Sequence, residues 1–212
     1  MRIGIIGAGN IGESLATLLV RAGHEVVIAN SRGPESLADL VGALGERASA
    51  ATVADAARMA DVVIEAIPFG KLDTLPKEEL AGKVLITAAN YYGARDGEID
   101  FGDRTQSEYL HAKLPRTHLA KAFNTIWFQH LRTEGDTSKP AEARRVIPFA
   151  ASDREAEEAA RTIIDDLGFG PLFLGDLSKT RDVSEPGGLL YNKQLTVAEA
   201  TQLLTTRSTS SN

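Results

Sequence analysis

Three glycines near the start of the chain have the spacing of a phosphate-binding turn. The segment reads Gly7, Ala8, Gly9, Asn10, Ile11 and Gly12. Gly7 would permit a tight turn, Gly9 would let the backbone approach a pyrophosphate, and Gly12 would let a helix pack closely on the preceding strand. Free amides at the start of that helix favour an anion, so the turn is a candidate dinucleotide site.

A polar cluster about 20 residues beyond the glycines indicates which dinucleotide would bind. An NAD site usually ends its second strand with Asp or Glu, which hydrogen-bonds the adenosine ribose. Here that position holds Asn30, Ser31 and Arg32. A hydroxyl and a guanidinium suit the 2′-phosphate of NADP(H), although the same residues would also suit a plain polar turn before a helix. The missing carboxylate favours NADP(H).

The rest of the chain offers no residue grouping for acid, base or metal catalysis. It has no cysteine, four histidines and no Ser-His-Asp or metal-ligand spacing, so we expect no metal site. Trp127 and Phe128 would either line a ring-binding pocket or pack in the core or in a homodimer interface. These alternatives stay open. His130 follows them, and we favour a structural role for it over substrate contact.

Alternating apolar runs and helical periodicities surround these residues. Strands are expected at 3–6, 25–29, 48–51, 61–67, 83–87, 118–123, 146–150 and 171–174, with helices between most of them. Pro148 would place its strand at a sheet edge or near a strand end. This pattern predicts an α/β fold, a Rossmann-type doubly wound and mainly parallel sheet with a short C-terminal extension.

We expect one NADP-binding domain over residues 1–212. Its core sheet would span 1–150, a helix-strand extension 151–175, and a C-terminal segment 176–212, which ends in a disordered tail from Ser208. The net charge of −6 and the absence of a dense Lys/Arg run argue against nucleic-acid or anionic-membrane partners. No apolar run is long enough to span a bilayer, and no signal peptide is visible, so a cytoplasmic location is expected.

Several segments together resemble one family, the coenzyme F420-dependent NADP oxidoreductases. The matching segments are 7–12, 22–26 (Ala-Gly-His-Glu-Val), 30–32, 89–92 (Ala-Asn-Tyr-Tyr) and 121–126 (Lys-Ala-Phe-Asn-Thr-Ile). The resemblance implies that Ser31 and Arg32 hold the 2′-phosphate. It also implies that the backbone at Ile67 and Pro68, and the segment Ala89 and Asn90, lie along the nicotinamide half.

The family's reaction is hydride exchange between NADPH and coenzyme F420, a deazaflavin that would be the second substrate. Such a transfer depends on holding two rings in position and needs little acid-base help. No catalytic residue is therefore assigned, and Asn90 and Asn124 are the candidate positioning residues. Two alternatives remain. One is an NADPH-dependent reductase of a flavin or a small carbonyl compound, with Tyr91, Tyr92 or Lys121 nearest to serve as proton donor. The other is a non-catalytic NADP(H)-binding redox sensor.

Overall fold

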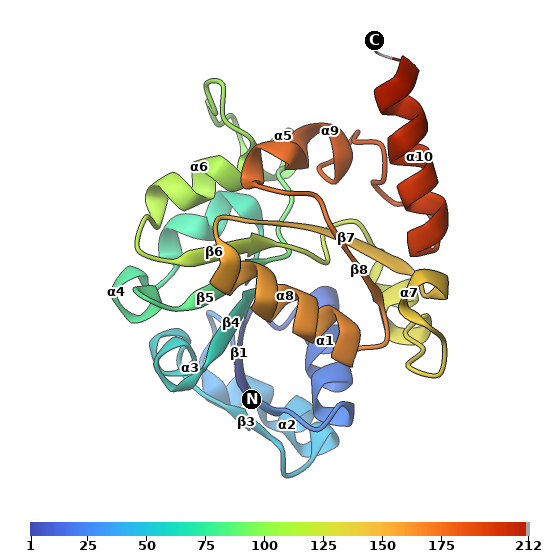
Figure 1. Cartoon of the computed structure of the whole chain (residues 1–212). Coiled ribbons are helices and arrows are strands. Elements are labelled where there is room, and N and C mark those ends of the chain that lie inside the picture. The colour runs from blue at the N-terminus through green and yellow to red at the C-terminus, as the bar shows by residue number, and fades with distance from the viewer. Residues whose placement is uncertain (211–212) are drawn as a thin grey trace.

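Eight strands form one sheet in the computed structural model, which describes residues 1–210 (Figure 1). The order across the sheet is β3-β2-β1-β4-β5-β6-β7-β8, and every pair is parallel except β6 with β7. The strands are β1 (Arg2–Ile6), β2 (Glu25–Ala29), β3 (Ala48–Ala50), β4 (Val62–Glu65), β5 (Val84–Thr87), β6 (His118–Lys121), β7 (Val146–Ala151) and β8 (Gly170–Phe173). The expected α/β, mainly parallel sheet is confirmed.

Helices cover both faces of this sheet. The longer ones are α1 (Asn10–Arg21), α2 (Ala38–Leu44), α3 (Val53–Met59), α6 (Gln106–Lys113), α7 (Phe128–Thr133), α8 (Arg154–Asp166) and α10 (Val197–Ser210). The short ones are α4 (Lys77–Leu80), α5 (Gly93–Asp96), α9 (Thr180–Val183) and the 3-10 turns η1 (Pro34–Leu37), η2 (Phe69–Thr74), η3 (Ala141–Ala143) and η4 (Leu177–Lys179).

The alternation of side chains along each strand divides the core into two layers. Ile3, Ile5 and their counterparts on the other strands pack against α1 and α8, whereas Ile6, Val63 and Leu85 pack against α3, η2 and α6. A parallel sheet buried on both faces needs apolar residues at nearly every strand position, and the four residues of β4 are all buried. Only Glu65, the last of these, carries a charge.

The strand order places the glycine turn at the centre of one sheet edge. The first six strands follow the order 3-2-1-4-5-6, in which the chain crosses from one side of β1 to the other. Ligands of such sheets bind where this reversal occurs, outside the carboxyl ends of the strands. The turn after β1 therefore lies between the loops that follow β2 and β4.

Two local predictions need correction. Pro148 is expected at a sheet edge or near a strand end, but β7 lies between β6 and β8, and Pro148 is the third of its six residues. The proline is tolerated since β7 pairs with β6 only at Ala150 and Ala151, so no β6 residue needs the amide that Pro148 lacks. The last helix, α10, runs to Ser210 and includes the start of the tail expected to be disordered, and residues 211–212 lie outside the described residues. The hydroxyls of Thr201, Thr205 and Thr206 in α10 donate to carbonyl oxygens four residues back in the helix.

Candidate functional site

Close backbone contacts explain two of the three glycines of the turn. Gly7 has a φ of 111°, and a Cβ there would lie 2.6 Å from the carbonyl oxygen of Ala66. A Cβ on Gly12 would lie 1.8 Å from the carbonyl oxygen of Gly7, so α1 can approach the turn only because residue 12 has no side chain. A Cβ on Gly9 would meet no atom within 4 Å. The space in front of Gly9 is open, as the approach of a pyrophosphate would require.

A cavity of about 630 Å³ lies on one side of this turn. Its walls come from the turn itself, the loop after β2, and the segment from Ala66 to Thr74 that follows β4. The lining residues include Gly7, Ala8, Gly9, Asn30, Ser31, Arg32, Ile67, Pro68, Lys71 and Thr74. No aspartate or glutamate is among the described residues that line it, which fits an anionic ligand.

Asn30 holds the loop that carries Ser31 and Arg32. Its Oδ1 accepts the backbone N–H of Arg32 at 2.9 Å, and its Nδ2 donates to the hydroxyl of Ser36 at 2.9 Å. These bonds give Asn30 a structural role, because its amide connects the end of β2 to η1. Both bonds form within the protein and do not require a ligand. The side chains of Ser31 and Arg32 are exposed at the cavity. Within residues 1–210 no ion pair to Arg32 is formed, so its guanidinium is available to a phosphate.

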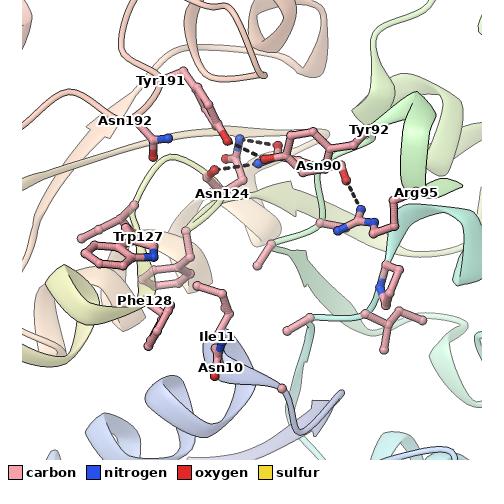
Figure 2. A pocket seen from close by; sticks show the side chains of 18 residues that line it. Asn10, Ile11, Asn90, Tyr92, Arg95, Asn124, Trp127, Phe128, Tyr191 and Asn192 are labelled. Atoms are coloured by element: carbon pink, nitrogen blue, oxygen red, sulfur yellow. Dashed lines mark hydrogen bonds between the residues drawn. The ribbon is translucent and has the colours of Figure 1, made fainter.

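A second cavity of about 440 Å³ continues from the first across Gly9, Ala66, Ile67 and Pro68. Figure 2 shows its lining: Asn10 and Ile11 from α1 on one side, Asn90 and Asn124 at the back, Trp127 and Phe128 at the start of α7, and Tyr191 opposite α1. The two cavities form one groove over the carboxyl ends of the strands. The glycine turn lies where the two cavities meet, because Gly9 lines both of them.

Asn90 and Asn124 bond each other at the back of the second cavity. Asn90 Nδ2 donates to the carbonyl oxygen of Asn124 at 2.8 Å, and Asn124 Nδ2 donates to Asn90 Oδ1 at 3.0 Å and to the carbonyl oxygen of Ser184 at 2.7 Å (Figure 2). Since both acceptors face Nδ2, the amide orientation of Asn124 is fixed. Its Oδ1 is buried and has no hydrogen-bond partner. A buried oxygen without a partner at a cavity wall is free to accept an N–H or O–H from a ligand.

The backbone just before Asn124 is in a conformation that few residues adopt. Phe123 has a φ of 62° and is buried. For a bulky side chain this left-handed conformation costs about 1–3 kcal/mol, and such residues cluster at functional sites. The sequence prediction that β6 continues to Phe123 is therefore wrong, because the strand ends at Lys121 and the chain turns sharply to present Asn124.

A buried polar chain supports the cavity wall from beneath. Glu65 accepts the N–H of Ile67 at 2.8 Å and the hydroxyl of Thr87 at 2.6 Å, and Lys121 donates to the carbonyl oxygen of Ala89. Burial raises the pKa of Glu65 to about 7 and lowers the pKa of Lys121 to about 8. The two wall segments implied by the resemblance, at Ile67 and Ala89, are thus held by Glu65 and Lys121. From the sequence, Lys121 was considered only as a proton donor, and Glu65 was not assigned to the site.

Residues distant in sequence complete the rim of the second cavity. The hydroxyls of Tyr92 and Tyr191 are hydrogen-bonded, and the N–H of Asn192 donates to the carbonyl oxygen of Thr125 at 3.1 Å. Arg95 donates to the carbonyl oxygen of Asn90 at 2.6 Å and pairs with Asp96. Sequence reasoning missed Arg95, Tyr191 and Asn192. No local signal marks them. Arg95 lies in the short helix α5, and Tyr191 and Asn192 reach the cavity because the segment after η4 returns to the sheet.

The structure also separates the remaining candidates. Trp127 and Phe128 line the cavity in edge-to-face contact, and Trp127 is 50% exposed at its mouth. His130 does not line the cavity, and its ring nitrogens lie 3.1–3.2 Å from Gln194 Nε2. The hydroxyl of Tyr91 donates to the carbonyl oxygen of Gly97, away from the cavity. Of the three proton donors considered for a carbonyl substrate, Tyr92 alone lines the cavity.

Within residues 1–210, no group of three or more histidine, aspartate or glutamate side chains is placed to hold a metal ion. None of the helices in the same range is both long enough and apolar enough to cross a membrane.

The turn, the strand order and the groove together define a Rossmann-type dinucleotide-binding protein. A family model described as NADP oxidoreductase, coenzyme F420-dependent, matches residues 2–91. The resemblance drawn from the sequence is therefore confirmed over this segment, which contains β1, the glycine turn, Ser31, Arg32 and the strands through β5. Residues 2–91, which include the glycine turn, therefore match the model of an NADP oxidoreductase family.

Comparison with individual proteins extends the similarity over most of the chain. The chain is 28% identical over 182 residues to the metalloreductase STEAP3 of Rattus norvegicus, which covers 86% of this chain but only 35% of that longer protein. The crystal structure of a hypothetical protein, SMa0349, from Sinorhizobium meliloti is 29% identical, with a TM-score of 0.79 over 92% of this chain and 95% of that one. A structure from Arthrobacter sp. FB24, described as a candidate F420-dependent NADP reductase, is 22% identical, with a TM-score of 0.69 over 97% and 91% of the two chains. This last likeness shows the fold alone.

Proposed function

We propose that this protein transfers a hydride between NADPH and coenzyme F420. NADPH, when bound, would supply the hydride, and the deazaflavin ring would gain that hydride together with a proton from water, leaving NADP⁺. The observation that carries the proposal is the continuous groove, with a cationic, carboxylate-free cavity at one end and an aromatic-lined cavity at the other. Family membership of residues 2–91 supports the NADPH half.

The residues at the first cavity fit the adenosine end of NADP(H). Gly9 leaves open space for the pyrophosphate, and the guanidinium of Arg32 has no protein partner within the described chain. Ser31 adds a hydroxyl donor beside it. An NAD-selective site would instead repel the 2′-phosphate with a carboxylate, and the lining residues include none.

The second cavity fits hydride transfer between rings better than reduction of a carbonyl. Its described lining contains no histidine, aspartate, glutamate or lysine, and Tyr92, Tyr191 and Arg95 are its ionisable groups. Burial and the bond to Tyr92 raise the pKa of Tyr191, so this phenol holds its proton. Aromatic walls at Trp127 and Phe128 offer apolar surface to a planar ring and exclude water, and Asn124 Oδ1 offers one fixed acceptor.

The test is NADPH oxidation by the purified protein with one acceptor at a time. Coenzyme F420, flavin mononucleotide and a small aldehyde would be compared under the same conditions, with NADPH deuterated at the transferred position. We expect turnover with F420, deuterium recovered in the reduced deazaflavin, and a kcat/KM for F420 at least about tenfold above that for the flavin.

Each other result points to a different function. Turnover with the flavin alone would replace F420 by a flavin acceptor. Turnover with the aldehyde, lost in Tyr92→Phe, would favour a carbonyl reductase. NADPH binding without turnover on any acceptor would favour a redox-sensing protein and would overturn the proposed enzyme.

A further inference from the structure

Two cations of the first cavity lie on opposite walls. Arg32 follows β2, and Lys71 belongs to η2, which follows β4; β1 and its glycine turn lie between these loops. Both residues line the cavity of about 630 Å³. Both are exposed, and among residues 1–210 neither forms an ion pair. No sequence motif singles out Lys71, because it lies in a polar stretch between two strands.

The geometry of η2 directs Lys71 toward the groove. A 3-10 helix has three residues per turn, so residues three apart share a face. Phe69 and Leu72 share one face and are buried in the core, whereas Lys71 and Thr74 share another and both line the cavity. The hydroxyl of Thr74 donates to the carbonyl oxygen of Lys71 at 2.7 Å.

The turn that carries Lys71 is also held firmly. The backbone N–H of Lys71 donates to the carbonyl oxygen of Pro68 at 2.8 Å, and the N–H of Gly70 donates to Asp96 Oδ1 at 3.1 Å. The ring of Phe69 makes an edge-to-face contact with that of Phe101, with 5.7 Å between the ring centres. The backbone of Lys71 is therefore held by these contacts, and its exposed side chain would be the part that adjusts to a ligand.

We propose that Lys71 is a second specificity-determining cation of the 2′-phosphate site, opposite Arg32. This inference rests on the proposed use of NADP(H). A phosphate monoester carries about −1.5 to −2 charges at pH 7. Arg32 alone would leave part of that charge unmatched, whereas two cations with no competing carboxylate would match it. Lys71 thus selects for the dianion by charge, and Arg32 adds the paired hydrogen bonds of a planar fork.

Adenosine 2′,5′-bisphosphate and adenosine 5′-monophosphate are suitable probes, because they differ only in the 2′-phosphate. Calorimetric titrations would compare the wild type with Lys71→Gln and with the matched control Lys77→Gln, a lysine of α4 that does not line the cavity. We expect Lys71→Gln to lower the affinity for the bisphosphate by about 3- to 10-fold, the range for an exposed ion pair with a doubly charged group. The affinity for the monophosphate should stay unchanged. Lys77→Gln should leave both unchanged.

The dianion also makes the effect depend on pH. Lowering the pH from about 7.5 to about 5.5 protonates the phosphate, so the loss caused by Lys71→Gln should shrink. Equal losses of affinity for both probes would place Lys71 at the 5′-phosphate or the adenine and overturn the inference. An unchanged affinity for both probes would also overturn it. A wild type that binds the two probes equally would overturn the proposed use of NADP(H) itself. Urea denaturation would verify that each variant is folded.

Discussion

The amide side chain of Asn124 both stabilises the cavity wall and offers a hydrogen-bond acceptor to a ligand. Its amide nitrogen is fully used by Asn90 and Ser184, while its amide oxygen is buried without a partner. Leaving such an oxygen unsatisfied costs about 1–3 kcal/mol, and a ligand donor would recover this free energy. The arrangement explains why an asparagine suits this position better than an aspartate, whose second oxygen would face two other oxygens.

Alanine at Asn90 or Asn124 should lower turnover and leave the affinity for NADPH nearly unchanged. The two residues line the second cavity and do not line the first, where Ser31 and Arg32 lie. We expect kcat to fall at least about tenfold, with NADPH affinity within about threefold of the wild type. Steady-state kinetics and a fluorescence titration would measure the two quantities. Equal losses in both would move the asparagines to the cofactor site.

Arg32→Ala should lower the affinity for NADPH much more than the affinity for NADH. A hydrogen bond to a charged group contributes about 1.5–3 kcal/mol, so the affinity should fall by roughly 10- to 150-fold. NADH lacks the 2′-phosphate and should change by less than about threefold. Titrations at low and high salt would test the assignment, because screening should reduce the difference between the two cofactors. A parallel loss for both cofactors would make Arg32 a structural anchor.

At the scale of elements, two glycines of the turn between β1 and α1 serve different purposes: Gly12 is required for folding and Gly9 for binding. Gly12→Ala places a methyl group against the carbonyl oxygen of Gly7 and should destabilise the fold by at least about 2 kcal/mol. Gly9→Ala meets no protein atom, so the fold should survive, but the methyl group would occupy the approach of the pyrophosphate. We expect Gly9→Ala to abolish binding of NADPH and NADH and to leave the midpoint of urea denaturation unchanged. Retained NADPH binding would show that the dinucleotide lies elsewhere.

The elements and the cofactor end of the groove were predictable because their signals are local. Apolar runs such as 62–64 are continuous, and the glycine spacing is explained by contacts within one strand-turn-helix unit. The acceptor end was only partly predictable. Asn90 and Asn124 follow strands and could be expected at the sheet edge, but Tyr191 and Asn192 reach it through the return of a segment with no periodicity. Lys71 was hidden in the same way, since its direction depends on a 3-10 turn that hydrophobic pattern does not predict.

At the scale of the whole molecule, the buried charges beneath the groove should affect the pH dependence of stability. Burial raises the pKa of Glu65 from 4.5 to about 7, so the folded protein binds this proton more tightly than the unfolded chain. The favourable contribution is complete below about pH 4.5 and is lost as the pH rises through about 7. The total change is on the order of 3 kcal/mol.

Glu65→Gln would test this directly. The glutamine oxygen can still accept the N–H of Ile67, but the group no longer titrates. Urea denaturation at several pH values should show that the free energy of unfolding of the wild type, relative to the variant, decreases between about pH 4.5 and about pH 7. A constant difference over this range would mean that Glu65 has an ordinary pKa. Lys121, whose pKa is lowered to about 8, would act only at higher pH and leaves this window clear.

Trp127 is the only tryptophan in the sequence and lies half-exposed at the mouth of the second cavity. Its emission overlaps the absorption band of a reduced nicotinamide and not that of an oxidised one. Because energy transfer falls steeply with distance, a reduced ring bound beside Phe128 would quench Trp127 strongly, and its oxidation would restore the signal. The protein therefore carries an intrinsic optical reporter, and a single stopped-flow trace could time cofactor arrival and hydride departure without any label.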